Sequence, residues 1–166
     1  MHNYAKRDEH IKKLGEMIKD INIAMMTTVE QDGSLRSRPM ATQQVEFDGD
    51  LWFFAREHSA KVDEVNQEQH VNISYANPDD QRYVSVSGTA TVVRDQQKAK
   101  ELWNPLLKAW FPDGLADPEL ALLKVSVDKA EYWDSPSSTV VQLVGFAKAL
   151  VTGKSYEGGD NEKIQL

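Results

Sequence analysis

The chain has 166 residues, a length that fits one domain with a sizeable hydrophobic core. Its 26 acidic against 19 basic residues give a formal net charge of −7, which argues against non-specific binding to nucleic acid or to an anionic membrane. The absence of cysteine excludes disulfides and thiolate chemistry, and no apolar stretch approaches the roughly 20 residues that span a bilayer, so we expect a soluble cytoplasmic protein.

The first third of the chain predicts one helix and three strands. Residues 8–19 place apolar side chains at helical spacing among charges, which is typical of an amphipathic helix. Strands are then expected over residues 21–29, 35–47 and 51–55, with an Asp-Gly turn between each pair. Because both turns are short, we expect these strands to form an antiparallel meander.

The rest of the chain alternates between helical and strand patterns. A short helix should open at Ser59, and strands should follow over residues 70–76 and 83–93, with Gly88 at a bulge. Pro105 should split a helical stretch over residues 95–111. Two more strands over 120–127 and 130–133, then a helix over 139–151, complete a small, partly closed antiparallel barrel. We expect a single domain over residues 1–154 and a flexible tail over 155–166.

Alternation along residues 35–47 separates two faces. One face carries Leu35, Ala41, Val45 and Phe47, and the other carries Arg36, Arg38, Met40, Thr42 and Gln44. Two arginines on one face are either the solvated side of an edge strand or an anion site, because guanidinium groups bind phosphate oxygens in pairs. We expect the arginine face to point away from the core.

The start of the short helix offers a second candidate for anion binding. Ser59 is a natural N-cap, and Val62 replaces the Glu or Gln of a capping box, so this helix start is either a simple cap or a phosphate site. Lys61 adds an ammonium group. Because we expect the two segments on adjoining strands, Arg36 or Arg38 could meet Ser59 and Lys61 around one phosphate.

The remaining aromatic, histidine and glycine-rich patterns give weaker indications of a functional site. Trp103 and Trp110 lie seven residues apart with Phe111 next to them, a spacing typical of core packing or a dimer contact, although a planar heterocycle could stack there. The four histidines show no metal-ligand spacing, and no Rossmann or Walker phosphate loop occurs. No acid–base pair for catalysis stands out.

The order of three segments resembles the flavin-binding split-barrel superfamily of pyridoxamine 5′-phosphate oxidase. These segments are Arg36-Ser37-Arg38-Pro39-Met40, Trp52-Phe53-Phe54-Ala55 and Ser59-x-Lys61-Val62. Segments at 83–88, 102–106, 108–114 and 131–134 are similar to the general stress protein 26 group. The resemblance covers roughly residues 8–153 and implies a mainly β (α+β) fold, a six-stranded antiparallel split β-barrel with flanking helices.

The resemblance also implies a cofactor and a partner. It implies a homodimer that binds FMN, or in some members FAD, in two equivalent sites at the subunit interface. By this likeness, Arg36 or Arg38 would hold the phosphate with Ser59 and Lys61. The flavin ring would be lined by the backbone of Met40, Ala41 and Thr42 and by the Phe53-Phe54 strand. Trp103, Trp110 and Phe111 would come from the partner subunit and would either cover the ring or close the interface.

The resemblance leaves the activity open. Pyridoxamine phosphate oxidases proper use an arginine and a histidine near the C-terminus, whereas the last ones here are Arg94 and His70, so we do not expect vitamin B6 oxidation. A flavin-dependent oxidoreductase with a small-molecule donor or acceptor, in stress response by family name, is one hypothesis. A flavin-storage or sensing protein, or a dimeric scaffold without ligand, is another. A deazaflavin or a haem is a further alternative, and haem would need His58 or His70 as an axial ligand.

Overall fold

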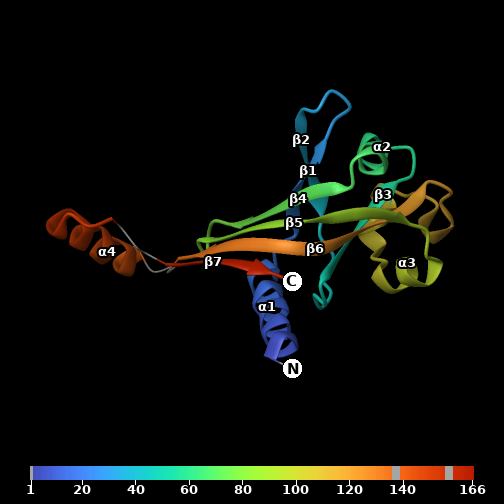
Figure 1. The fold of residues 1–166 in the computed structure, drawn as a ribbon. Coiled ribbons are helices and arrows are strands. Elements are labelled where there is room, and N and C mark those ends of the chain that lie inside the picture. Colours follow the sequence, from blue (N-terminus) through green and yellow to red (C-terminus); the bar gives the residue numbers. More distant parts are fainter. Residues whose placement is uncertain (1, 136–138, 156–158) are drawn as a thin grey trace.

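The computed structural model describes residues 2–135, 139–155 and 159–166. Within these ranges six strands follow one another across an antiparallel sheet in the order β2-β1-β4-β5-β6-β3, and a further strand, β7, pairs with β6 (Figure 1). The strands are β1 (Ile23–Val29), β2 (Leu35–Ala41), β3 (Asp50–Arg56), β4 (His70–Asn77), β5 (Arg82–Val93), β6 (Leu120–Asp134) and β7 (Asp160–Gln165). The helices are α1 (His2–Ile18), α2 (Ala60–Gln67), α3 (Gln96–Leu102) and α4 (Thr139–Thr152), with 3₁₀ turns at Pro105–Ala109 and Gly114–Ala116.

The sheet curls into a half-barrel around one main hydrophobic core. Alternate side chains of the strands, such as Met26, Ile73 and Val86, point into this core, and Leu14 of α1 is buried there as well. A second, smaller cluster forms around Phe54 together with α3 and the 3₁₀ turns. The expected antiparallel split-barrel architecture with flanking helices is therefore confirmed.

The predicted meander of the first three strands is wrong. Strands β1 and β2 form the expected hairpin, but β3 pairs with β6 instead of β2. The strand predicted over residues 35–47 ends at Ala41, and the following residues form a loop that buries Phe47 in the main core. Because the chain crosses the core here, β2 and β3 lie at opposite ends of the sheet order.

The predicted faces of β2 are also reversed. Leu35, expected in the core, is 73% exposed, whereas Met40, on the arginine side, is buried. The side chain of Arg38 is only 13% exposed. The arginine face therefore points inward at the edge of the half-barrel, because α2 lies there and supplies polar partners that the periodicity of one strand does not show.

Two local predictions about the later strands can be tested at Gly88 and Pro105. The register of β5 against β6 shifts at Gly88, as expected for a bulge, and a Cβ atom here would lie 2.4 Å from the Ser126 carbonyl oxygen. The two strands expected over 120–133 form one continuous strand, β6, because the extra residue Asp128 is absorbed at this bulge. Pro105 separates α3 from the following 3₁₀ turn, as predicted.

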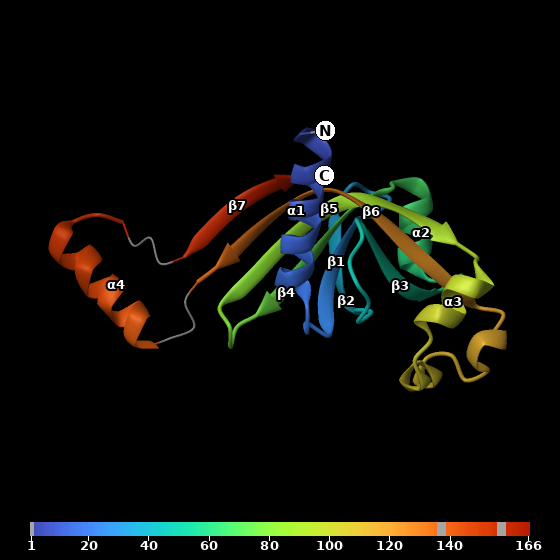
Figure 2. The same ribbon diagram turned by 90° about the horizontal axis from the view of Figure 1, so that it is seen from below.

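The C-terminal region differs from its prediction. Residues 160–165 of the expected flexible tail form β7, because Ile164 is buried opposite Ala130 of β6, while residues 156–158 lie outside the described part of the chain. Helix α4 forms where expected, but Figures 1 and 2 show it standing away from the half-barrel. Its apolar side chains at Leu143, Val144 and Leu150 are exposed in this subunit. None of the described helices is both long and apolar enough to cross a bilayer.

Candidate functional site

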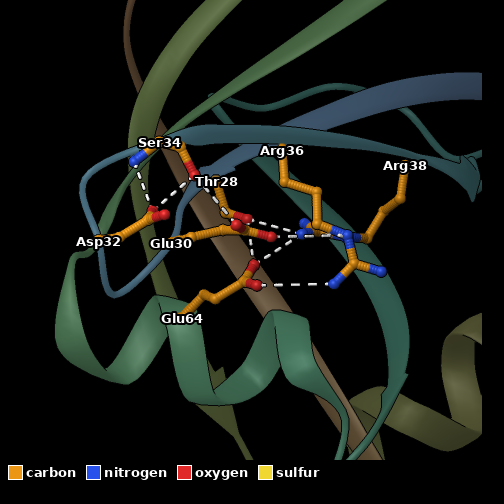
Figure 3. A network of polar contacts seen from close by, with 7 residues as sticks. All are labelled: Thr28, Glu30, Asp32, Ser34, Arg36, Arg38 and Glu64. Carbon is orange, nitrogen blue, oxygen red and sulfur yellow. Dashed lines mark hydrogen bonds and ion pairs between the residues drawn. The ribbon is translucent and has the colours of Figure 1, made fainter.

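Arg38 is the centre of a polar network between β1, β2 and α2 (Figure 3). Its Nη2 donates to Glu64 Oε2 of α2 at 2.6 Å and to the hydroxyl of Thr28 on β1 at 2.8 Å. The Thr28 hydroxyl in turn donates to the same Glu64 oxygen. Two side chains, one from β1 and one from α2, thus hold one nitrogen of the guanidinium group in place.

Arg36 lies on the same side of β2 and is half exposed. Its Nη1 is 3.7 Å from Glu64 Oε1, and its Nε is 3.9 Å from Glu30 Oε1, so two carboxylates flank this guanidinium group. Glu30 and Asp32 both accept a hydrogen bond from the Ser34 hydroxyl, which orders the β1–β2 turn beside the network. The arginines are therefore held by a set of acids that the sequence analysis did not identify.

Two buried polar atoms near the start of α2 and on β2 lack a partner in the structure. They are Nη1 of Arg38 and Oγ of Ser59. Ser59 occupies the N-cap position of α2, but its side chain makes no capping hydrogen bond. Leaving a buried polar atom unpaired costs about 1–3 kcal/mol, so both atoms are suited to a ligand that accepts hydrogen bonds.

Lys61 belongs to the same electrostatic environment. Partial burial lowers the pKa of its ammonium group below the usual 10.5, and the positive charges of Arg38 and Arg36 lower it further. Glu64, three residues after Lys61 on α2, ion-pairs with Arg38 and Arg36, so this part of the helix lies against both arginines. Arg36, Arg38 and Lys61 therefore form one basic cluster, and Ser59 lies two residues before the lysine in the sequence.

This convergence arises differently from the sequence prediction. The two segments do not lie on adjoining strands; instead α2 brings them together by packing Val62 and Val65 into the main core. The side chain of Glu64 is only 13% exposed because it pairs with Arg38 and Thr28 across the sheet edge. The helical pattern did not distinguish it from exposed Asp63, which also lies between the two core valines in the sequence.

The residues predicted to line the flavin ring lie at the end of β2 and on β3, which are at opposite ends of the sheet order. Met40 and Phe53 are buried in the main core, so only their backbone could face a ligand. Ala41 is exposed, and the Thr42 hydroxyl donates to the Ile21 carbonyl. Phe54 points into the second cluster.

The predicted aromatic cover separates into two side chains that pack within their own subunit and one that is exposed. Trp103 and Phe111 pack against Phe54 of their own subunit, with ring centroids 5.9 Å and 6.4 Å away. Trp110 is 59% exposed, and neighbouring Leu106 is more exposed still. Of the three predicted aromatics, Trp110 therefore presents the largest free surface.

The histidines bear on the haem alternative. His58 and His70 lie at the surface, and their Nδ1 atoms contact Glu119 and Glu68 at 3.0 Å and 2.7 Å. Axial ligation of haem requires an apolar pocket around the histidine. The exposed positions of both residues therefore disfavour haem.

Fold and site together define a split-barrel protein with a basic cluster between one strand edge and a short helix. The chain belongs to the pyridoxamine 5′-phosphate oxidase-like family, whose sequence model matches residues 9–157. It is 34% identical to protein bli-3 of Neurospora crassa in an alignment 157 residues long that covers 89% of this chain and 75% of that protein.

Solved structures agree with this family. The general stress FMN/FAD binding protein from Xanthomonas citri is 28% identical, with a TM-score of 0.67 over 79% of this chain and 92% of that one. A structure ascribed to general stress protein 26 of a Jannaschia species has a TM-score of 0.77 and covers 96% of this chain and 99% of its own. Its identity of 21% makes it a likeness of fold alone.

Proposed function

We propose that this protein binds a flavin nucleotide, FMN in the first instance, and that the basic cluster of Arg36, Arg38, Ser59 and Lys61 holds its phosphate. The observation that carries the proposal is the pair of buried, unpartnered atoms, Arg38 Nη1 and Ser59 Oγ, in the two segments that carry the cationic side chains of Arg36, Arg38 and Lys61. Membership of the family and the likeness to an FMN/FAD binding protein support the same ligand.

The residues present fit a phosphate monoester. Arg38 Nη1 and the Ser59 hydroxyl can donate hydrogen bonds, and the ammonium of Lys61 adds charge-assisted attraction. Glu64 and Glu30 offset part of the positive charge, so the cluster carries an excess of about one positive charge for an anionic ligand. FAD would place a diphosphate in the same cluster and remains the second candidate.

The remaining predicted residues would serve the flavin ring. We propose that the backbone of Met40, Ala41 and Thr42 and the Phe53-Phe54 strand line it, and that Trp103, Trp110 and Phe111 of a second subunit cover it. Exposed Trp110 supports this arrangement. Exposed apolar side chains on the outer face of β1 and β2, at Ile23, Met25 and Leu35, support a homodimer.

An oxidoreductase is the activity that this cofactor supports best. A bound flavin supplies one- and two-electron transfer, while the chain would bind, orient and partly shield it. We propose a cytoplasmic enzyme that exchanges electrons with a small molecule, with a role in stress response suggested by its relatives. Flavin storage or sensing without turnover is the second candidate.

The first experiment is an absorbance spectrum of the purified protein, followed by parallel titrations with FMN and riboflavin. FMN binding with a clear preference over riboflavin is the expected result, because riboflavin lacks the phosphate. Equal affinity for the two would contradict the phosphate site. Steady oxidation of NADH or NADPH by the FMN complex would support an enzyme, whereas its absence with several acceptors would favour storage or sensing.

A further inference from the structure

We propose that Glu64 and Thr28 are positioning residues for the phosphate: they hold Nη2 of Arg38 so that Nη1 of the same guanidinium group is presented to the ligand. This inference rests on the proposed flavin function and deepens it. It assigns a role to two residues that carry no positive charge, one of which repels an anion.

The two ends of the Arg38 guanidinium group have opposite surroundings. Nη2 is saturated, with Glu64 Oε2 at 2.6 Å and Thr28 Oγ1 at 2.8 Å (Figure 3). Nη1 is buried and has no hydrogen-bond partner. If Glu64 merely competed with a ligand for Arg38, its two carboxylate oxygens would be expected to bind both terminal nitrogens of the guanidinium group in a bidentate pair. Here one end is held and the other is left available.

The groups that hold Nη2 are themselves fixed by the fold. Thr28 is fully buried on β1, where β-branched side chains have few rotamers. Glu64 lies on α2 between Val62 and Val65, which anchor the helix in the main core. The Thr28 hydroxyl also bonds to the Glu64 oxygen that receives Arg38, so the three side chains fix one another. Such rigid support is what a precise binding group requires.

The position of Glu64 also separates the ligand side from an acidic side. Away from Arg38, Glu64 borders a depression that is also lined by Glu30, Asp32 and Asp63. An anion is repelled from this acidic depression. The approach open to a phosphate is therefore at Arg38 Nη1, which is buried and has no hydrogen-bond partner.

Glu64 has an electrostatic role in the free protein as well. Arg36, Arg38 and Lys61 are like charges in a partly buried site, and within the described chain Glu64 is the acid that ion-pairs with Arg38. Without that acid, mutual repulsion and burial would favour a rotamer that carries Arg38 out to solvent. Ligand binding would then have to return it to the site.

The test compares FMN with riboflavin in three variants of the full-length protein. Glu64→Gln keeps a carbonyl oxygen for Arg38 and Thr28, so its preference for FMN should stay at or above that of the wild type. Glu64→Ala removes the support, and the preference should fall by about tenfold or more, as for a lost charge-assisted hydrogen bond. Thr28→Val, similar in shape, should give a smaller loss. Glu9→Ala is the control, because it removes an exposed acid from α1 that does not line the acidic depression.

The outcomes separate this inference from the proposed function. If the wild-type protein binds FMN no better than riboflavin, both the phosphate site and the positioning role are wrong. If the wild type prefers FMN but Glu64→Ala binds it as tightly or more tightly, Glu64 only opposes the phosphate and this inference alone is wrong. Parallel losses for FMN and riboflavin would show a merely structural role and would overturn it as well.

Discussion

Arg38 and Lys61 are the side chains whose removal tests the phosphate site most directly. Arg38→Ala and Lys61→Ala should each weaken FMN binding by about 1.5–3 kcal/mol, because each removes a charge-assisted contact, and should leave riboflavin binding nearly unchanged. Lys12→Ala, which removes an exposed charge from α1, is the control. Isothermal titration with both ligands measures the difference, and unchanged FMN affinity in both site variants would remove the proposed site.

The lowered pKa of Lys61 predicts a pH dependence. Burial lowers it first and the two arginines lower it further, so the ammonium loses its proton below the usual 10.5. The preference for FMN over riboflavin should therefore decline on the alkaline side before an ordinary lysine titrates.

The same shift in pKa predicts how the stability of the ligand-free protein changes with pH. Between the lowered pKa of the folded state and 10.5, the unfolded chain binds more protons at Lys61 than the folded protein does. The free energy of unfolding should therefore rise as pH increases through this window.

Lys61→Arg is the control for this pH dependence. Arginine keeps its charge throughout the range, so the variant should show a nearly flat FMN-to-riboflavin ratio. Measurement of the two dissociation constants across neutral and alkaline pH gives the profile. An equally steep decline in Lys61→Arg would assign the titration to another group.

At the scale of single elements, the β5–β6 bulge depends on a glycine. A Cβ atom at Gly88 would lie 2.4 Å from the Ser126 carbonyl oxygen, so Gly88→Ala must displace one backbone strand. We expect a loss of about 1–3 kcal/mol in the free energy of unfolding, comparable to overpacking in a core. Urea denaturation measures it, with exposed Thr91→Ala on the same strand as the control. A loss no larger than that of the control would contradict the close approach.

Strand β7 provides a second prediction at this scale. Ile164 is 1% exposed, so Ile164→Ala should destabilise the protein by about 2–4 kcal/mol and should increase hydrogen exchange in β7. Exposed Lys163→Ala should change neither. A flexible tail would tolerate both substitutions equally. That result would contradict the pairing of β7 with β6.

At the scale of the whole molecule, helix α4 carries apolar side chains that are exposed in the subunit, among them Leu143 and Val144. Leu150 and Val151 are both more than 80% exposed, whereas folded monomers seldom leave a helix face of this kind in water. We expect analytical ultracentrifugation to show a homodimer. Leu150→Glu combined with Val151→Glu should weaken the dimer without changing the circular dichroism of the sheet. A wild-type monomer would contradict the proposed partner arrangement.

The sequence predicted much of the fold because many elements depend on local signals. Alternation located most strands, Pro105 divided the helical stretch and Gly88 marked the bulge. The prediction failed where distant segments decide the structure. The partner of β3 is β6, and short loops did not reveal this. Strand β7 rests on a single buried isoleucine in a polar segment, which is too weak a local pattern to predict a strand.

For the candidate site, the sequence by itself determined which side chains have the right chemistry: two arginines two residues apart, a serine at a helix start and a lysine two residues later. It did not determine that the arginine face points inward, nor that Thr28 and Glu64 hold Arg38. Only the tertiary structure decided these points, because they depend on where α2 packs against β1 and β2. Alternation along one strand separates two faces, but the elements that cover each face decide which of them is buried.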